Sequence, residues 1–268
     1  MYVTTAASLT FATEGFIAPG PGNFELPPAF SILGFDVTKS MLLLVLSGIL
    51  IIAITYVVSR PAAVVPGRLQ FAGEAVYGFV RNGIARDSIG THDFMKFVPY
   101  LFSLFLFVFV NNYYGVIPFL QFPTFSRISY VYGLAALTWV IYNAAGISRH
   151  GFFGYLRRQT VPGGVKGPIL VLIIPLEFLS NIIVRPATLA LRLFANLFAG
   201  HLLLILFSTG AAYLIFESDK IAYAPVGVLS FILGILVSFL ELLVMFLQAY
   251  VFTLLTAMYI GGALADEH

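Results

Sequence analysis

Five ionisable residues lie within the last two long apolar stretches of this chain: Glu177, Arg185, Arg192, His201 and Glu241. Charged side chains are expensive inside hydrocarbon, so residues of this kind usually mark an ion pathway. Arginine keeps its proton and cannot relay it, but it supplies a fixed positive charge. Histidine and glutamate can take up and release protons when they are partly buried. The set predicts a proton pathway in which Arg192 is a barrier and His201 with Glu241 is a relay.

Two simpler interpretations stay open for these residues. Glu177 and Arg185 lie nearer the first end of their stretch, and their side chains could snorkel to the membrane interface as anchors. His201 and Glu241 could form a buried hydrogen-bonded pair that only holds two helices together. Arg192 lies too deep for snorkelling, so it is the strongest single indication of function.

Helical spacing assigns the polar residues of the first of these two stretches to different faces of one helix. Thr188, Arg192 and Asn196 are four residues apart and share one helix face. His201 is nine residues from Arg192, which at ~3.6 residues per turn is roughly 180° around the helix. We therefore expect His201 to face away from Arg192, so that the pathway has two offset halves.

The register of the two stretches gives a second expectation. Polar residues at 217–220 separate the stretches, so an antiparallel hairpin would turn there. That turn places Gln248 beside Arg192 and Glu241 beside His201. Glu241 and Gln248 are seven residues apart and share a face of the second helix. The pattern predicts two pairs of neighbouring polar residues across the hairpin, Gln248 with Arg192 and Glu241 with His201.

A barrier arginine needs a mobile carboxylate to approach it, and no spare carboxylate lies deep in this chain. Either Glu241 is the partner of Arg192, or another subunit supplies the carboxylate.

Composition favours a membrane as the solvent. Hydrophobic residues make up 60% of the chain and charged residues 10%, against about 25% charged in soluble domains; the mean hydropathy is +0.97. The net charge of +2 and the lack of a basic tail argue against nucleic acid as a partner. The chain has no cysteine, and its four histidines are far apart. We therefore expect no metal site and no cofactor.

The apolar runs predict an all-α polytopic membrane protein with five spans. A span needs about 20 apolar residues, and three separate runs fit: 40–59, 97–125 (its helix ending near Ile117) and 128–148. The stretches 167–216 and 221–264 are too long to cross a core of ~30 Å upright, so we expect one long tilted hairpin. Residues 68–90 mix apolar and charged residues, as is typical of an amphipathic helix at the interface.

Lysine and arginine in the short loops set the expected orientation. The loops after the first and third spans carry most of them, so these loops should be cytoplasmic. The expected organisation is an extracytoplasmic N-terminal segment (1–36) that is not a cleaved signal peptide, three transmembrane helices (37–148), a cytoplasmic loop (149–166), the hairpin (167–264) and a cytoplasmic tail (265–268). Residues 1–30 could be either a disordered tail or an ordered cap.

Four segments of the chain have distinctive patterns, and the most specific is Leu189-Ala-Leu-Arg-Leu-Phe-Ala-Asn-Leu-Phe-Ala-Gly-His201. The others are Val65-Pro-Gly-Arg-Leu-Gln70, Asn112-Tyr-Tyr-Gly-Val-Ile-Pro118 and Gln248-Ala-Tyr-Val-Phe252. In these segments the chain resembles subunit a of the rotary F-type ATP synthase, in its bacterial form. The resemblance covers about residues 30–268, in order, with the expected number of spans.

The resemblance implies a role for each candidate residue. Arg192 would face the ring of c subunits, each of which brings the missing carboxylate, and Gln248 would lie beside it. Thr188 and Asn196 would flank the arginine, and His201, Glu241 and Asn112 would line the outer half-channel. Glu177 and Arg185 would belong to the cytoplasmic side. The implied partners are the c ring, the b subunits of the peripheral stalk, the remaining synthase subunits and membrane lipid, and the implied location is the bacterial plasma membrane.

The expected function is proton conduction coupled to rotation and ATP synthesis, by a subunit that is not an enzyme on its own. The chain lacks the Gly-rich Lys-Ser/Thr loop that cradles nucleotide phosphates. The alternatives are a secondary ion transporter, a subunit that only anchors a stator, and a sodium-coupled version of the same subunit. A transporter would show internal repeats, and the two halves of this sequence show none.

Overall fold

A computed structural model of the chain describes residues 16, 18–20, 22, 30–32, 35–59, 67–117, 120, 122–161, 169–218 and 221–265. In this part of the chain, five helices are long and apolar enough to cross a membrane: Lys39–Ser59 (α1), Phe94–Tyr113 (α4), Ile128–His150 (α5), Leu170–Glu217 and Ala224–Leu264 (α9). The predicted polytopic helical fold is confirmed. Most of the predicted N-terminal segment, the end of the predicted cytoplasmic loop and the tail at 266–268 lie outside the described residues.

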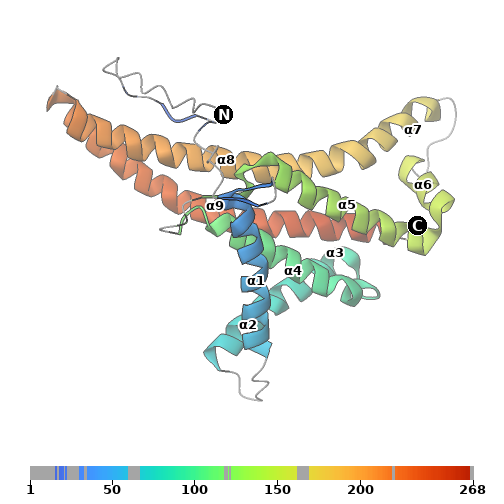
Figure 1. Cartoon of the computed structure of the whole chain (residues 1–268). Helices are drawn as coiled ribbons and strands as arrows, with labels where there is room; N and C mark the ends of the chain where they lie inside the picture. The colour runs from blue at the N-terminus through green and yellow to red at the C-terminus, as the bar shows by residue number, and fades with distance from the viewer. Residues whose placement is uncertain are drawn as a thin grey trace.

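The last two spans form the long hairpin that the sequence predicted. The first arm runs without interruption through α7 (Leu170–Leu179), a π-helical turn η4 (Ser180–Val184), α8 (Arg185–Ala212) and a second π-helical turn η5 (Tyr213–Glu217). A 3₁₀ turn, η6 (Ile221–Tyr223), then leads into α9, which packs along α8. Figure 1 shows α8 and α9 side by side and α1 running crosswise to them.

This crosswise arrangement explains how helices of such different lengths share one bilayer. The 21 residues of α1 measure ~31 Å at 1.5 Å per residue, which matches a hydrocarbon core of ~30 Å. The 48-residue arm of the hairpin measures ~72 Å by the same rule. With α1 upright, the hairpin must therefore be strongly tilted.

The helix predicted at residues 68–90 is present as α2 (Arg68–Gly78), a π-helical turn η2 (Phe79–Arg86) and α3 (Asp87–Ile89). Its second half is built into the protein, because Val80 and Ile84 are fully buried in the main core. Its first half exposes Leu69 and Phe71. These exposed apolar side chains suit a helix lying at a membrane surface.

The core lies where α4, α5, α8 and α9 meet. Its spacing on α8 is regular: Leu189, Leu193 and Leu197 are buried at intervals of four residues, which is one stripe of a helix. Facing residues on α9 include small ones, such as the fully buried Ala249 and Ala257. Small residues let helix backbones approach closely in membranes, where packing and not water exclusion holds helices together.

Close backbone contact also fixes the last turns of α9. A Cβ at Gly261 would overlap the backbone carbonyl oxygen of Ser88 on α3. Only glycine therefore fits where α9 meets the interfacial helix.

Two elements extend the predicted architecture. Residues Phe30–Ile32 (β1) and Phe35–Val37 (β2) pair antiparallel, with Phe30 opposite Val37. Helix α6 (Phe152–Thr160) lies in the segment predicted as a cytoplasmic loop and follows Gly151, whose φ of 72° is accessible to glycine.

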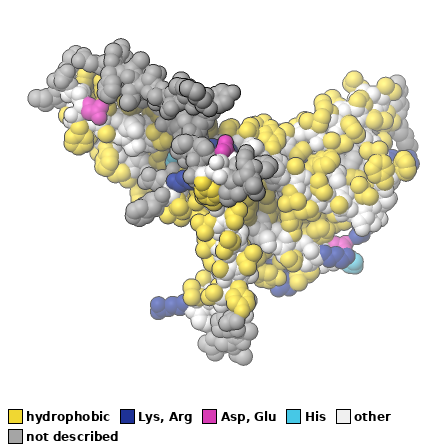
Figure 2. Space-filling view, viewed as in Figure 1, with side chains coloured by type: hydrophobic (Ala, Val, Ile, Leu, Met, Phe, Trp, Pro, Cys, Tyr) yellow, Lys and Arg dark blue, Asp and Glu magenta, His cyan; other side chains and the backbone are white. Residues whose placement is uncertain are grey.

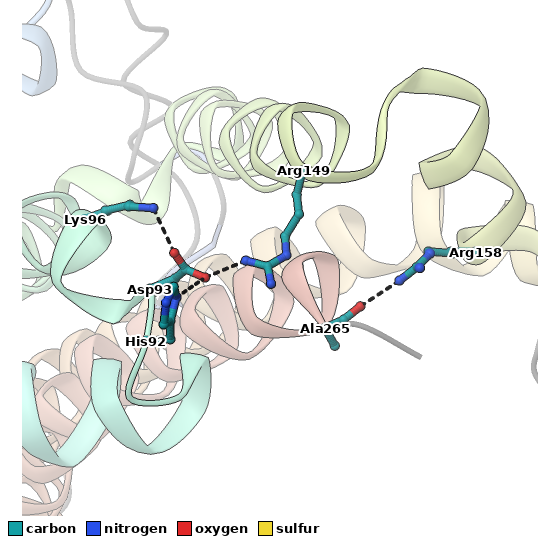
Figure 3. A network of polar contacts seen from close by, with 6 residues as sticks. All are labelled: His92, Asp93, Lys96, Arg149, Arg158 and Ala265. Carbon is teal, nitrogen blue, oxygen red and sulfur yellow. Dashed lines mark hydrogen bonds and ion pairs between the residues drawn. The ribbon is translucent and has the colours of Figure 1, made fainter. Parts of the chain in front are cut away.

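Charged side chains on the visible surface lie mainly toward the edges of a hydrophobic body (Figure 2). One cluster joins the start of α4 to the end of α5: the carboxylate of Asp93 accepts Lys96 Nζ at 2.8 Å and Arg149 Nη1 at 2.6 Å, with His92 Nδ1 at 3.4 Å (Figure 3). The hydrogen bonds from Lys96 and then His92 lower the pKa of Asp93 to about 2. This carboxylate stays ionised and holds the two helix ends together.

Candidate functional site

Arg192 lies on the face of α8 that turns away from the interior of the chain. The buried stripe of Leu189, Leu193 and Leu197 directs it there, because Arg192 is out of step with that four-residue spacing. Its side chain is exposed and has no ion-pair or hydrogen-bond partner among the described residues. Within the described chain, then, no carboxylate pairs with this charge.

Thr188 lies one turn before Arg192 on the same exposed face. Its hydroxyl donates to the carbonyl oxygen of Val184 at 2.8 Å and contacts that of Arg185 at 3.1 Å. These bonds within the helix satisfy the hydroxyl, so Thr188 contributes a small polar surface beside the arginine.

One turn after Arg192, α8 is bonded to α9. Asn196 Nδ2 donates to Gln248 Oε1 at 2.8 Å. Gln248 is only 5% exposed, and its Nε2 has no hydrogen-bond partner in the described part of the chain. The bond thus orients the Gln248 amide near the turn that carries Arg192.

Glu241 is buried between the two arms of the hairpin. It is 5% exposed, and neither carboxylate oxygen has a hydrogen-bond partner among the described residues. Its Oε1 would lie 3.1 Å from a Cβ at Gly200, so the missing side chain of that glycine makes room for the carboxylate. The expected neighbour His201 is the next residue of α8 and is half-buried.

Asn112 joins α4 to the part of α9 that carries Glu241. It is fully buried and donates from Nδ2 to the carbonyl oxygen of Met245 at 3.0 Å. The neighbouring Tyr113 hydroxyl donates to the carbonyl oxygen of Leu242 at 3.2 Å. Both acceptors lie on α9 between Glu241 and Gln248, so α4, α8 and α9 all contribute polar groups here.

Glu177 and Arg185 are eight residues apart in the first arm of the hairpin, and both are half-buried. Glu177 Oε2 accepts a long hydrogen bond of 3.4 Å from Asn181 Nδ2. The Arg185 guanidinium lies 5.5 Å from the ring centroid of Tyr259 on α9, a cation–π distance. The two residues form no ion pair with each other among the described contacts.

Comparison with known proteins assigns the family. The family model described as the ATP synthase A chain matches residues 41–261. The chain belongs to the ATP synthase subunit a family. The resemblance predicted from the Arg192 segment is thereby confirmed.

Curated members of the subunit a family align along nearly the whole chain. ATP synthase subunit a of Nocardioides sp. (strain ATCC BAA-499 / JS614) is 59% identical over 99% of this chain and 100% of its own length. Those of Pseudarthrobacter chlorophenolicus and Streptomyces lividans are 48% and 43% identical, over 94% and 95% of this chain and 95% and 90% of their own lengths.

The structure shows polar residues near Glu177 that sequence reasoning missed. Asn181 Nδ2 contacts Glu177 and the carbonyl oxygen of Gln159, the Tyr142 hydroxyl donates to the Asn181 carbonyl oxygen, and Tyr155 accepts from the Gln159 side chain. The available signal was an asparagine within an apolar stretch, four residues after Glu177 and so on the same helix face. In the described residues, no group of three or more His, Cys, Asp and Glu side chains could hold a metal ion.

Proposed function

We propose that this chain is the proton-conducting stator subunit of the ATP synthase membrane sector. It would supply two offset half-channels that load and unload the carboxylates of the c ring, so that proton flow drives rotation and ATP synthesis. One observation carries the proposal: Arg192 stands exposed and unpaired within the described chain, one turn from the Asn196–Gln248 bond. A buried or exposed arginine in a span calls for an anionic partner, and here that partner has to come from another subunit.

The exposed face of α8 suits a helix that moves past it. Ala195 and Ala199 are exposed beside Arg192, and small residues allow a neighbouring helix to come close. As a carboxylate reaches Arg192, the positive charge favours its ionised form. The proton is released to the cytoplasmic half-channel, and the arginine keeps its own protons throughout.

The outer half-channel would be lined by Glu241, Asn112 and His201. Glu241 and Asn112 present buried oxygen atoms with no hydrogen-bond partner among the described residues. Buried polar groups normally have such partners, and a chain of proton carriers would provide them. A proton entering here would reach the c-ring carboxylate before the ring turns away through lipid.

The inner half-channel would begin at Glu177 and Arg185, near the other end of the α7–α8 arm. The excess of Lys and Arg in the loops after the first and third spans supports a cytoplasmic position for this end and an N-terminus outside. In this arrangement Arg192 lies between the two halves and belongs to neither. The subunit would work with the c ring and the b subunits of the peripheral stalk in a bacterial plasma membrane, and nucleotide chemistry would take place on other subunits.

ATP-driven proton pumping by the assembled complex tests the proposal. Arg192→Ala should abolish pumping in membrane vesicles while the amount of assembled complex stays unchanged. Arg68→Ala, which removes an exposed arginine on α2, is the matched control and should pump normally. Normal pumping by Arg192→Ala would favour a subunit that only anchors the stator. Pumping that requires sodium would favour the sodium-coupled version, and transport by the purified chain alone would favour a secondary transporter.

A further inference from the structure

Asn181 is the second residue of the π-helical turn η4, between Glu177 and Arg185 in the chain, and is 6% exposed. Its Nδ2 donates to the carbonyl oxygen of Gln159 at 2.6 Å and to Glu177 Oε2 at 3.4 Å. The short bond fixes the amide to α6, and the second N–H is thereby aimed at the Glu177 carboxylate. π-helical turns inside α-helices often occur at functional sites.

The sequence explains why the backbone of Asn181 is also held from outside its helix. In the wider π-helical turn the N–H of Arg185 bonds to the carbonyl oxygen of Ser180. The next residue, Pro186, has no N–H to offer. The carbonyl oxygen of Asn181 instead accepts the Tyr142 hydroxyl of α5 at 3.2 Å. Asn181 is therefore held by two hydrogen bonds. Its backbone carbonyl oxygen accepts one from α5, and its side-chain amide donates one to α6.

Helix α6 is itself locked in place by Tyr155. A side chain at Gly146 of α5 would overlap the ring of Tyr155, so the ring lies directly on the α5 backbone. The Tyr155 hydroxyl donates to Asn143 Oδ1 at 3.0 Å and accepts Gln159 Nε2 at 2.6 Å. These contacts fix Gln159, whose carbonyl oxygen anchors the Asn181 amide.

Charged and titratable groups approach this cluster from several elements. Arg185 enters from α8, Tyr142 from α5, Tyr155 from α6 and Tyr259 from α9. Burial raises the pKa of Tyr155, and the Gln159 hydrogen bond and the charge of Arg185 only partly offset this. Glu177 is the only carboxylate among the described residues of the cluster.

We propose that Asn181 is a positioning residue for proton exchange at the cytoplasmic half-channel: clamped by α5 and α6, it donates a hydrogen bond that orients the Glu177 carboxylate and stabilises its ionised form. This inference rests on the proposed function, in which Glu177 exchanges protons on that side. A hydrogen bond to a carboxylate favours its charged form, so replacing the Asn181 amide should change proton exchange on this side. The role accounts for both contacts that hold Asn181, the backbone bond with Tyr142 and the side-chain bond with Gln159.

The test uses everted vesicles carrying the membrane sector with the soluble sector stripped off, so that the cytoplasmic face meets the bath. An imposed potassium diffusion potential drives proton uptake, and the initial rate is recorded against bath pH. Asn181→Asp has nearly the shape of the natural residue but sets a second negative charge beside Glu177. We expect the midpoint of the pH profile to move up by about one pH unit, because a like charge disfavours ionisation. Asn181→Ala, which only removes the donor, should move it in the same direction by less.

Matched variants separate positioning from folding. Asn111→Asp makes the same exchange at a buried asparagine on α4, which donates to Ser47, and should leave the midpoint unchanged. In a Glu177→Gln background, Asn181→Asp should no longer shift the midpoint. A lower rate with an unshifted midpoint in both Asn181 variants would overturn the positioning role alone. If Glu177→Gln itself left rate and midpoint unchanged, the inner half-channel of the proposed function would fall as well.

Discussion

Asn196 on α8 and Gln248 on α9 join the two arms of the hairpin by a hydrogen bond of 2.8 Å, one turn from Arg192. The bond crosses between helices whose contacts are otherwise largely apolar. It fixes the rotation of α8 against α9 and so sets the direction in which Arg192 projects. The register of the hairpin therefore helps to determine the geometry of the site around Arg192.

A double-mutant cycle should detect this bond. Asn196→Ala, Gln248→Ala and the double variant are compared by denaturant titration of the assembled membrane sector. We expect a coupling free energy of about 0.5–1.5 kcal/mol, the range for a hydrogen bond between neutral groups. Strictly additive effects would show that the two amides do not depend on each other. Thr209→Ala, on the exposed side of α8, should be additive with Gln248→Ala.

Gly200→Ala should slow proton entry. The added Cβ would lie 3.1 Å from Glu241 Oε1, which is closer than a carbon and an oxygen pack comfortably, so the carboxylate has to shift. We expect a several-fold lower rate of proton uptake from the outer side at unchanged assembly. Gly210→Ala is the matched control on the same helix, because its new Cβ would meet only Phe16 at 3.7 Å. Equal rates for the two variants would contradict a role for the position of Glu241.

The register of the hairpin could be predicted closely from the sequence, because the polar turn near residue 220 and the helical repeat leave few choices. The structure places Gln248 on Asn196, one turn from the predicted neighbour Arg192, and Glu241 at Gly200, one residue from the predicted neighbour His201. Of the two π-helical turns in the first arm, only η5 lies between these positions and the turn of the hairpin, and it changes the helical repeat locally. The observed contacts of Gln248 and Glu241 lie within one turn of the neighbours predicted with a uniform repeat.

The cluster around Asn181 could not be predicted in the same way. Its bonds join α5, α6 and η4 through backbone carbonyls of Gln159 and Asn181. Backbone acceptors carry no sequence signal, and α6 lies in a segment that looked like a loop because Arg157, Arg158 and Gly154 interrupt its apolar residues. Only the folded chain brings these groups together.

Asp93 should stabilise the chain over the whole physiological pH range. Its pKa is lowered to about 2 from an ordinary 3.8, so its contribution is fully present above pH ~4 and is lost as the pH falls through about 2. Asp93→Asn should lower the thermal dissociation temperature of the membrane sector at pH 7, and lower it much less near pH 2, where most of the contribution is lost. Asp87→Asn, at an exposed site on α3, should have little effect at either pH. A deficit of Asp93→Asn that persists unchanged at pH 2 would contradict this assignment.

Gly261→Ala should destabilise the junction of α9 with α3. The new Cβ would overlap the backbone carbonyl oxygen of Ser88, which cannot rotate away as a side chain could. Overpacking of this kind costs about 1–3 kcal/mol. Gly262→Ala is the matched control, since nothing lies within 4 Å of its new Cβ. Denaturant titration of the two variants compares them directly, and equal stability would show that α9 can slide past α3 at no cost.

Passive proton conductance tests the central claim, that Arg192 is the barrier between two half-channels. Vesicles carrying the membrane sector without the soluble sector are given a potassium diffusion potential, and proton uptake is compared for the natural chain and Arg192→Ala at equal amounts of assembled complex. If Arg192 separates the half-channels, the variant should still conduct protons passively while ATP-driven pumping by its intact complex is lost. A variant that pumps normally, or one that neither pumps nor conducts, would contradict the account.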